Sequence, residues 1–327
     1  MMSRVATRAS SLAGVMLACT AIAAAAATPD IVLEPQRLSA HCWVFQGAVG
    51  PASAANRGYM SNAGFVVTDD GVVVFDALGT PPLGEAMIAA IRRITAQPIR
   101  RVVVSHYHAD HIYGLQAFKA IGAEIWAQRK AKLYIDSPLA NDRLAQRRVE
   151  LSPWVDERTR LVPPDVWIDG DTDFRLGGLV FRLLYSGGAH SPEDTMMYVV
   201  DDRVLYAGDL LFAGRVPFVV GGDSRGWLDA VKRLVALQPP PAIVGPGHGG
   251  ISRDVARDVS LTRDYLVYLR DTMGRAVADL QPFDEAYAAT DWSRFAALPA
   301  FAQANRGNAY AVYLQMEQEA LDGAARK

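Results

Sequence analysis

The stretch RVVVSHYHADH, residues 101–111, places three histidines and an aspartate directly after an apolar run that is expected to form a strand. Imidazole and carboxylate are the side chains that bind zinc-like cations at neutral pH. Side chains two residues apart in an extended segment point to the same side, so His106 and His108 can reach one ion together. Asp110 and His111 follow where the chain turns toward a helix, and they are expected to serve a second ion. A chance match to this pattern is expected on the order of once in ten thousand chains, so the stretch predicts a metal site.

Three more residues of the same chemical types stand beside glycines at the ends of apolar runs. His190 follows Gly187-Gly188-Ala189, Asp209 follows Gly208, and His248 lies between Gly247 and Gly249. Taken singly, each would more often be a surface, core or turn residue. Glycine permits close backbone approach, and side chains at strand ends can converge, so together they are expected to join the first cluster. This set uses five of the six histidines; His41 is interpreted as structural.

The remaining pattern predicts an α/β chain. Short apolar runs between turn residues indicate strands at 43–45, 64–67, 72–75, 101–104, 123–127, 174–176, 179–185, 196–200, 203–207 and 242–244. Helical spacing of apolar residues indicates helices at 81–96, 113–121 and 225–237, and over most of 252–321. Residues 128–165 carry mixed charge and four prolines, which favours a helical or loop insertion. Two successive runs of strand, helix and strand, each ending in helix, predict a sandwich of sheets covered by helices.

The first 27 residues have the pattern of a secretory signal peptide. Arg4 and Arg8 precede an apolar run over 12–22, and alanines at 23–27 offer cleavage sites. A core or transmembrane helix and lipoprotein cleavage before Cys19 are the less favoured interpretations. We expect a periplasmic or secreted protein with no integral membrane span after cleavage. Cys42 is then the one cysteine left, expected as a buried, inert thiol in a chain without an intramolecular disulfide.

Composition gives no sign of an electrostatic partner. The chain has 33 basic and 35 acidic residues, a formal net charge of -2, and loss of Arg4 and Arg8 would make it 31 minus 35, or -4. Nucleic-acid binding is therefore not expected. Half of the residues are apolar, an ordinary globular composition, and the length permits one layered domain or two.

The order of the candidate ligands resembles the metallo-β-lactamase superfamily, over about residues 41–260. The resemblance implies a four-layer αββα sandwich of two mixed β-sheets flanked by helices. One domain would span 28–327, with a helical insertion near 128–165 and C-terminal helices over 252–321. Two divalent metal ions are implied, zinc foremost, with iron or manganese as alternatives. By this resemblance the first ion is held by His106, His108 and His190, the second by Asp110, His111 and His248, and Asp209 bridges. Asp76, after the strand at 72–75, matches an acidic position of the family and is expected to orient ligands.

The resemblance further implies hydrolysis of a small-molecule substrate: an ester, thioester, lactone or lactam. A hydroxide shared by the two ions would attack, and Asp110 would take or relay a proton as the catalytic residue. Antibiotic-hydrolysing members usually have Cys or Ser where this chain has Asp209, which points away from a β-lactamase proper, although that remains an alternative. The second alternative is a metal-binding accessory protein of a periplasmic oxidation pathway, either non-catalytic or redox-active. The stretches GDLLFAGRVP (208–217) and RGWL (225–228) are similar to exported bacterial metallohydrolases associated with sulfur oxidation and quinoprotein relays. The oligomeric state is open.

Several loop residues have two interpretations each. Tyr107 either donates a hydrogen bond to a developing oxyanion or packs beside the ligands. Arg215 either binds an anionic group or forms an ordinary ion pair. The insertion, with aromatic residues Tyr134, Trp154 and Trp167, either walls the pocket or buries a dimer interface.

Overall fold

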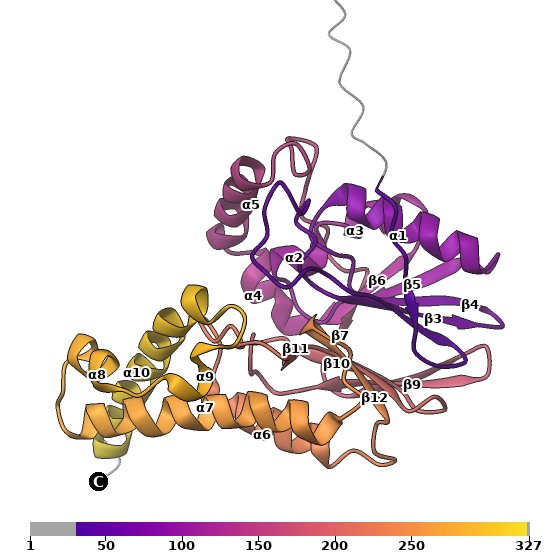
Figure 1. The fold of residues 1–327 in the computed structure, drawn as a ribbon. Coiled ribbons are helices and arrows are strands. Elements are labelled where there is room, and N and C mark those ends of the chain that lie inside the picture. The colour runs from indigo at the N-terminus through magenta and orange to yellow at the C-terminus, as the bar shows by residue number, and fades with distance from the viewer. Residues whose placement is uncertain (1–30, 326–327) are drawn as a thin grey trace, which may run out of the picture.

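The computed structural model describes residues 31–325 as four layers, in the order helix, sheet, sheet, helix (Figure 1). Both sheets are mixed, and helices cover the outer face of each. The expected α/β sandwich is therefore confirmed. The predicted signal peptide lies outside the described residues.

The first sheet has seven strands in sequence order and comes entirely from the first half of the chain. They are β1 (Gln36–Arg37), β2 (Cys42–Phe45), β3 (Ala63–Thr68), β4 (Gly71–Phe75), β5 (Ile99–Val103), β6 (Glu124–Gln128) and β7 (Val166–Ile168). Neighbours are antiparallel up to β4 and parallel from β4 to β7. Helices α1 (Pro81–Ile94) and α3 (Leu115–Ala120) pack their apolar sides on its outer face. Thr80 caps α1 by accepting a hydrogen bond from the Leu83 amide, and Pro81 begins the helix.

The second sheet has five strands in the order β12-β11-β10-β9-β8 and comes from the second half. They are β8 (Thr172–Leu176), β9 (Leu179–Tyr185), β10 (Thr195–Val199), β11 (Val204–Ala213) and β12 (Ile243–Gly249). Only β11 and β12 pair in parallel. Helices α6 (Ser224–Val235) and α7 (Val255–Ala278) cover this sheet (Figure 1). Helix α10 (Phe301–Ala325) packs against α7, with the short helices α8 (Phe283–Ala289) and α9 (Ser293–Ala296) beside it.

An apolar layer joins the inner faces of the two sheets. Fully buried side chains such as Val73 and Val103 from the first sheet pack in one cluster with Phe181 and Met197 from the second. Each large apolar side chain buried in this way contributes about 1.5–3 kcal/mol. Tyr206 crosses the layer, and its hydroxyl donates to the carbonyl of Trp43 at 2.9 Å. Packing of this kind fixes the ends of strands from different sheets relative to one another.

Two strands extend further than their sequences suggested. The prediction ended one at 207 and the other at 244, because glycine and proline normally interrupt strands. In the structure β11 continues to Ala213 and β12 to Gly249, with irregular register between Tyr206 and Phe212. Both extensions carry candidate ligands. Strand β7 was not predicted.

Gln128 ends β6, and the rest of the segment to residue 165 contains the 3-10 helix η1 (Arg129–Ala131), then α4 (Lys132–Ile135) and α5 (Pro138–Glu150), and no strand. Asp110 and His111 lie on a single-turn helix, α2 (Ala109–Ile112), which ends before the helix that the sequence predicted there. No helix among residues 31–325 combines the length and apolar character needed to cross a bilayer. Cys42 is buried and unpaired as expected, and burial raises the pKa of its thiol to about 12.

Candidate metal centre

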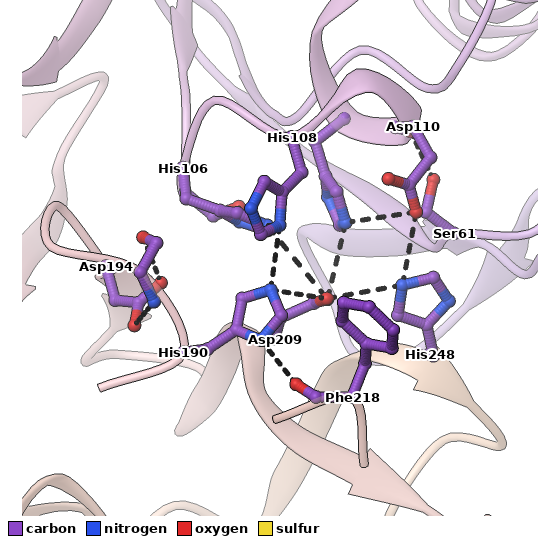
Figure 2. Close-up of polar contacts among 12 residues, drawn as sticks. Ser61, His106, His108, Asp110, His190, Asp194, Asp209, Phe218 and His248 are labelled. Carbon is purple, nitrogen blue, oxygen red and sulfur yellow. Dashed lines mark hydrogen bonds and ion pairs between the residues drawn. The ribbon is translucent and has the colours of Figure 1, made fainter. Parts of the chain in front are cut away.

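All seven predicted ligands converge at one end of the junction between the sheets. Figure 2 labels six of them, all but His111. Four come from the first half of the chain, in the loop after β5 and on α2: His106, His108, Asp110 and His111. Three come from the second half, namely His190 in the loop between β9 and β10, Asp209 on β11 and His248 on β12. Their positions agree with the sequence expectation that distant strand ends meet here.

The first group consists of three imidazoles whose ring nitrogens nearly touch. His108 Nδ1 lies 3.0 Å from His106 Nε2 and 2.9 Å from His190 Nε2. The rings stand edge to face, with centroids 4.5 to 4.9 Å apart. Three nitrogen atoms directed at a common point are the arrangement expected of ligands to one ion.

The second group combines imidazole and carboxylate. His248 Nε2 lies 3.2 Å from Asp110 Oδ2, and His111 Nε2 lies 3.6 Å from the same oxygen. Asp209 stands between the groups: its Oδ2 is 3.3 Å from both His190 Nε2 and His248 Nε2, and its Oδ1 is 3.3 Å from His111 Nε2. Figure 2 shows the Asp209 carboxylate between His190 and His248. One carboxylate therefore contacts ligand nitrogens of both groups.

Hydrogen bonds on the outer ring nitrogens orient four imidazoles toward the centre. Two of these rings, His190 and His248, donate to backbone carbonyls. His190 Nδ1 donates to the Phe218 carbonyl at 2.9 Å, and His248 Nδ1 donates to the Met60 carbonyl at 3.0 Å. A carbonyl can only accept, so Nδ1 of each ring carries a proton and Nε2 faces the cluster. Such outer partners fix the tautomer and orientation of metal-binding histidines.

Asp76 orients one histidine from each group. Its Oδ2 accepts hydrogen bonds from His111 Nδ1 at 2.9 Å and from Ser105 Oγ at 2.7 Å. Ser105 Oγ, having donated its own proton, accepts from His106 Nδ1 at 2.9 Å. The orienting role expected of Asp76 is thus seen directly, and Ser105, which the sequence did not single out, relays it to His106.

The polar atoms of the seven candidate ligands would be better satisfied by bound cations than they are by one another. His111 Nε2 and Asp209 Oδ1 are buried and have no hydrogen-bond partner within residues 31–325. Buried polar atoms are normally satisfied. His106 Nε2 and His190 Nε2 both face His108 Nδ1, which can donate to only one of them. Nitrogen and carboxylate ligands of this number suit two divalent ions. The residues present therefore fit the implied metals.

The two groups hold protons differently. Burial and the neighbouring imidazoles lower the pKa of His106 and of His108, the latter to about 3, and burial lowers that of His190. Burial opposes protonation of His111 and His248 as well, but the adjacent carboxylates outweigh it. The pKa of His248 is raised to about 9. The first group is thus neutral and ready to bind at pH 7, while the second holds protons.

We expect the two ions to differ in the pH dependence of their affinity. The second ion must displace protons from His111 and His248, so its affinity should rise from pH 7 to about pH 9 by about tenfold per unit for each proton displaced. The first ion should bind with little change over the same range. Chelator competition at pH 7, 8 and 9, starting from metal-free protein, measures both affinities. Equal slopes for the two ions would contradict this.

Asn62 is a buried residue that the sequence analysis missed. Its amide nitrogen donates to the carbonyls of Pro246 at 2.9 Å and Gly249 at 3.0 Å, and its backbone N–H donates to Gly247 at 2.7 Å. These bonds hold β12 on both sides of His248. A lone asparagine before a strand carries no sequence signal for such a role.

Gly247 leaves no room for a side chain. A Cβ atom there would lie 1.9 Å from Asp209 Oδ1, so alanine must displace the carboxylate. We expect Gly247→Ala to weaken binding of both ions, measured as the zinc content after dialysis. Gly250→Ala is the matched control, because a Cβ there meets nothing within 4 Å. Full zinc content in Gly247→Ala would show that zinc binding does not require the Asp209 carboxylate in its present position.

A cavity of about 500 Å³ opens over the cluster, the size of a small-molecule site. Its wall includes His108, Asp110, His190, Asp209 and His248, together with Tyr134 and other residues of the 128–165 segment. The insertion therefore walls the pocket, through α4 and α5. Trp154 and Trp167 are not in the wall: Trp154 donates to the Ala54 carbonyl, and Trp167 packs on the core.

Tyr107 and Arg215 each follow one of their two interpretations. The Tyr107 hydroxyl is buried and donates to the Val162 carbonyl at 3.0 Å, so the oxyanion role is wrong: the phenol points into the core. Arg215 forms no ion pair within the described chain, so the framework role is wrong too. Its side chain lines the cavity instead.

The loop that carries His190 is held by Asp194, which accepts from the Ser191 hydroxyl at 2.7 Å (Figure 2).

Comparisons with known proteins agree with this geometry. A probable metallo-hydrolase of Bacillus subtilis, YqgX, is 26% identical over 204 residues, which is 62% of this chain and 87% of that protein. A type 2 metallo-β-lactamase of Elizabethkingia meningoseptica is 24% identical over 197 residues, 58% of this chain and 69% of that protein. The solved structure of the inverting sec-alkylsulfatase Pisa1 from Pseudomonas sp. shares the fold, with a TM-score of 0.68 at 18% identity, covering 86% of this chain and 50% of that one.

The family model described as the metallo-beta-lactamase superfamily matches residues 56–248. That range contains every candidate ligand, both groups and the shared carboxylate. The fold, the ligand order and this match lead to one conclusion: the chain belongs to the metallo-β-lactamase superfamily.

Proposed function

We propose that this protein is a periplasmic hydrolase that uses two zinc ions to cleave a small ester, thioester, lactone or lactam. The observation that carries the proposal is the Asp209 carboxylate, which contacts ligand nitrogens of both groups. A shared carboxylate is suited to hold two cations side by side. The periplasmic location rests on the signal pattern of residues 1–27.

In this proposal His106, His108 and His190 hold one ion, and Asp110, His111 and His248 hold the other, with Asp209 common to both. Bound there, the pair supplies a Lewis acid for the scissile carbonyl and an attacking water activated at neutral pH. The hydrogen bonds that the imidazoles donate to Asp76, Ser105 and the backbone carbonyls keep the rings oriented toward the ions.

Asp110 is the proposed proton carrier. Its side chain is 16% exposed, against 5% for Asp209, and it lines the cavity. The neighbouring imidazoles of His111 and His248 hold the pKa of its carboxyl below the usual range despite burial, so it is ionised at neutral pH. A carboxylate that faces substrate can take a proton from the attacking water and pass it to the leaving group.

The choice among substrates follows from the bridging position. Asp209 replaces the Cys or Ser of the antibiotic-hydrolysing enzymes that the sequence resembles, so a non-lactam carbonyl is favoured over a lactam. A β-lactamase proper and an accessory protein without turnover are the competing outcomes of the test below.

The test combines metal analysis of native protein with a hydrolysis panel. We expect about two zinc ions per chain and turnover of at least one ester, thioester or lactone. His108→Ala should lose turnover, whereas His41→Ala should keep it, because His41 lies outside the cluster and pairs with Asp202 at 2.8 Å. Iron in place of zinc with redox activity, or metal-replete protein inert across the panel, would each overturn the proposal. Cleavage of nitrocefin alone would favour the competing β-lactamase.

A further inference from the structure

We propose that Arg215 binds an anionic group on the substrate, and that the substrate is an amphiphile in which this anion is joined to an apolar chain. The inference rests on the proposed hydrolase function and names the class of molecule that enters the site. It concerns a residue outside the ligand set.

Arg215 is a buried cation without a partner. Only 7% of the residue is exposed, and its Nε and Nη1 atoms are buried with no hydrogen-bond partner within residues 31–325. No carboxylate of that range lies within 4.0 Å of the guanidinium. A buried, unpaired charge is costly, so a protein that keeps one at its active-site cavity is expected to use it for a ligand.

The guanidinium stands beside the metal cluster. Arg215 lines the same cavity as His190, Asp209 and His248. It lies over the ring of Phe212, 5.8 Å from the centroid, and that ring stacks on the His248 imidazole with centroids 5.2 Å apart. A substrate group held by Arg215 would therefore lie next to the reacting centre.

The carboxylates nearby do not serve as its counterions. Burial lowers the pKa of Arg215, and Asp209 and Asp110 offset that only in part. Two divalent ions bound to these carboxylates would more than cancel their charge. With ions bound there, these two carboxylates would be engaged by the metals, and an anionic group on the substrate could pair with Arg215 instead.

Two other arginines line the cavity, and both are engaged. Arg143 donates to Gln146 at 3.0 Å, and Arg147 donates to Glu150 at 2.8 Å. Both lie on α5, within one helical turn of their partners. Among the arginines that line this cavity, Arg215 is therefore the one whose buried N–H donors have no partner within the described chain.

The outer wall of the cavity is apolar. Leu133 on α4, Leu139 on α5 and Phe218 in the loop after β11 line it, and they are 66%, 58% and 45% exposed. Large apolar side chains left in water around a polar cavity are typical of ligand-binding walls. The cavity therefore offers a cation inside and an apolar surface toward its opening, which matches an anion with an alkyl or aryl chain.

Binding of octane-1-sulfonate, which has no bond for the enzyme to hydrolyse, tests the proposal by calorimetry. Arg215→Met in the zinc-loaded protein should lose about tenfold or more in affinity, because a charge-assisted contact is removed. Arg175→Met, an exposed arginine on β8, should keep wild-type affinity. Ethanesulfonate and octan-1-ol, which lack the chain and the charge respectively, should each bind more weakly than octane-1-sulfonate. Leu133→Ser combined with Leu139→Ser should reduce the advantage of the longer sulfonate.

A thermal melt separates this role from a structural one. Removing an unpaired buried charge should leave the melting temperature of Arg215→Met unchanged or higher, whereas loss of a framework contact would lower it. Unchanged sulfonate affinity in Arg215→Met, or weaker affinity together with a lower melting temperature, would overturn the proposal. Arg215-dependent sulfonate binding by a protein without turnover would leave this inference standing and remove the hydrolase. Turnover of neutral esters without Arg215 dependence would do the reverse.

Discussion

Asp209→Ala is expected to reduce hydrolysis on the order of a thousandfold and to lower the zinc content below two ions per chain. The carboxylate contacts His111, His190 and His248 at 3.3 Å, so both groups lose an oxygen at once. Turnover on a substrate found in the panel and the zinc content after dialysis measure the effect.

Asp202→Ala is the matched control for this change. Asp202 is also a buried carboxylate paired with a histidine, His41, but it lies outside the cluster. It should keep two zinc ions and normal turnover. If Asp209→Ala retained both ions with full activity, the two groups would have to act as separate sites.

Asp76→Asn is expected to lower the affinity for both ions by about 10- to 100-fold, although Asp76 is not a proposed ligand. Its two oxygens accept three hydrogen bonds: from the Ser105 backbone, from the Ser105 hydroxyl and from His111 Nδ1. An amide offers one accepting oxygen only, so at least one of these donors loses its partner. Chelator competition, read for each ion, is the measurement.

Asparagine is the informative substitution because the backbone at Asp76 is left-handed, with φ of 63°. Asn tolerates this conformation, so the change isolates the carboxylate. Asp202→Asn again supplies the control, since Asp202 also accepts from a serine hydroxyl, a backbone amide and a histidine Nδ1. Weaker binding of the second ion alone in Asp76→Asn would show that the link through Ser105 to His106 has no effect on binding.

The sequence predicted the fold, and the candidate ligands that it named lie together in the structure. His106 to His111 are contiguous, and apolar runs marked most strands. Strands β11 and β12 were cut short because Gly208 and the Gly245-Pro246-Gly247 stretch look like strand ends. Their irregular geometry is what lets Asp209 and His248 approach each other.

What the sequence did not predict depends on contacts across long distances in the chain. Asn62 holds β12 from 184 or more residues away, and the Met60 and Phe218 carbonyls act through backbone atoms that any residue would supply. Tyr107 sits inside the motif, yet its hydroxyl points to Val162, because neighbours in an extended segment face opposite sides. The absence of a partner for the Arg215 guanidinium could be recognised only from the three-dimensional positions of the groups around it.

Each sheet is built from one contiguous half of the chain, and each proposed ion takes ligands from both halves. Bound metal would therefore act as a pair of cross-links between two structural halves that packing and the hydrogen bonds of Asn62 and Met60 to β12 also join at this end. Metal affinity is then thermodynamically linked to the free energy that holds the two halves together, because an ion that binds only to the assembled site stabilises that assembly by mass action. Starving the protein of metal would then loosen the seam between the sheets as well as remove the reactive centre.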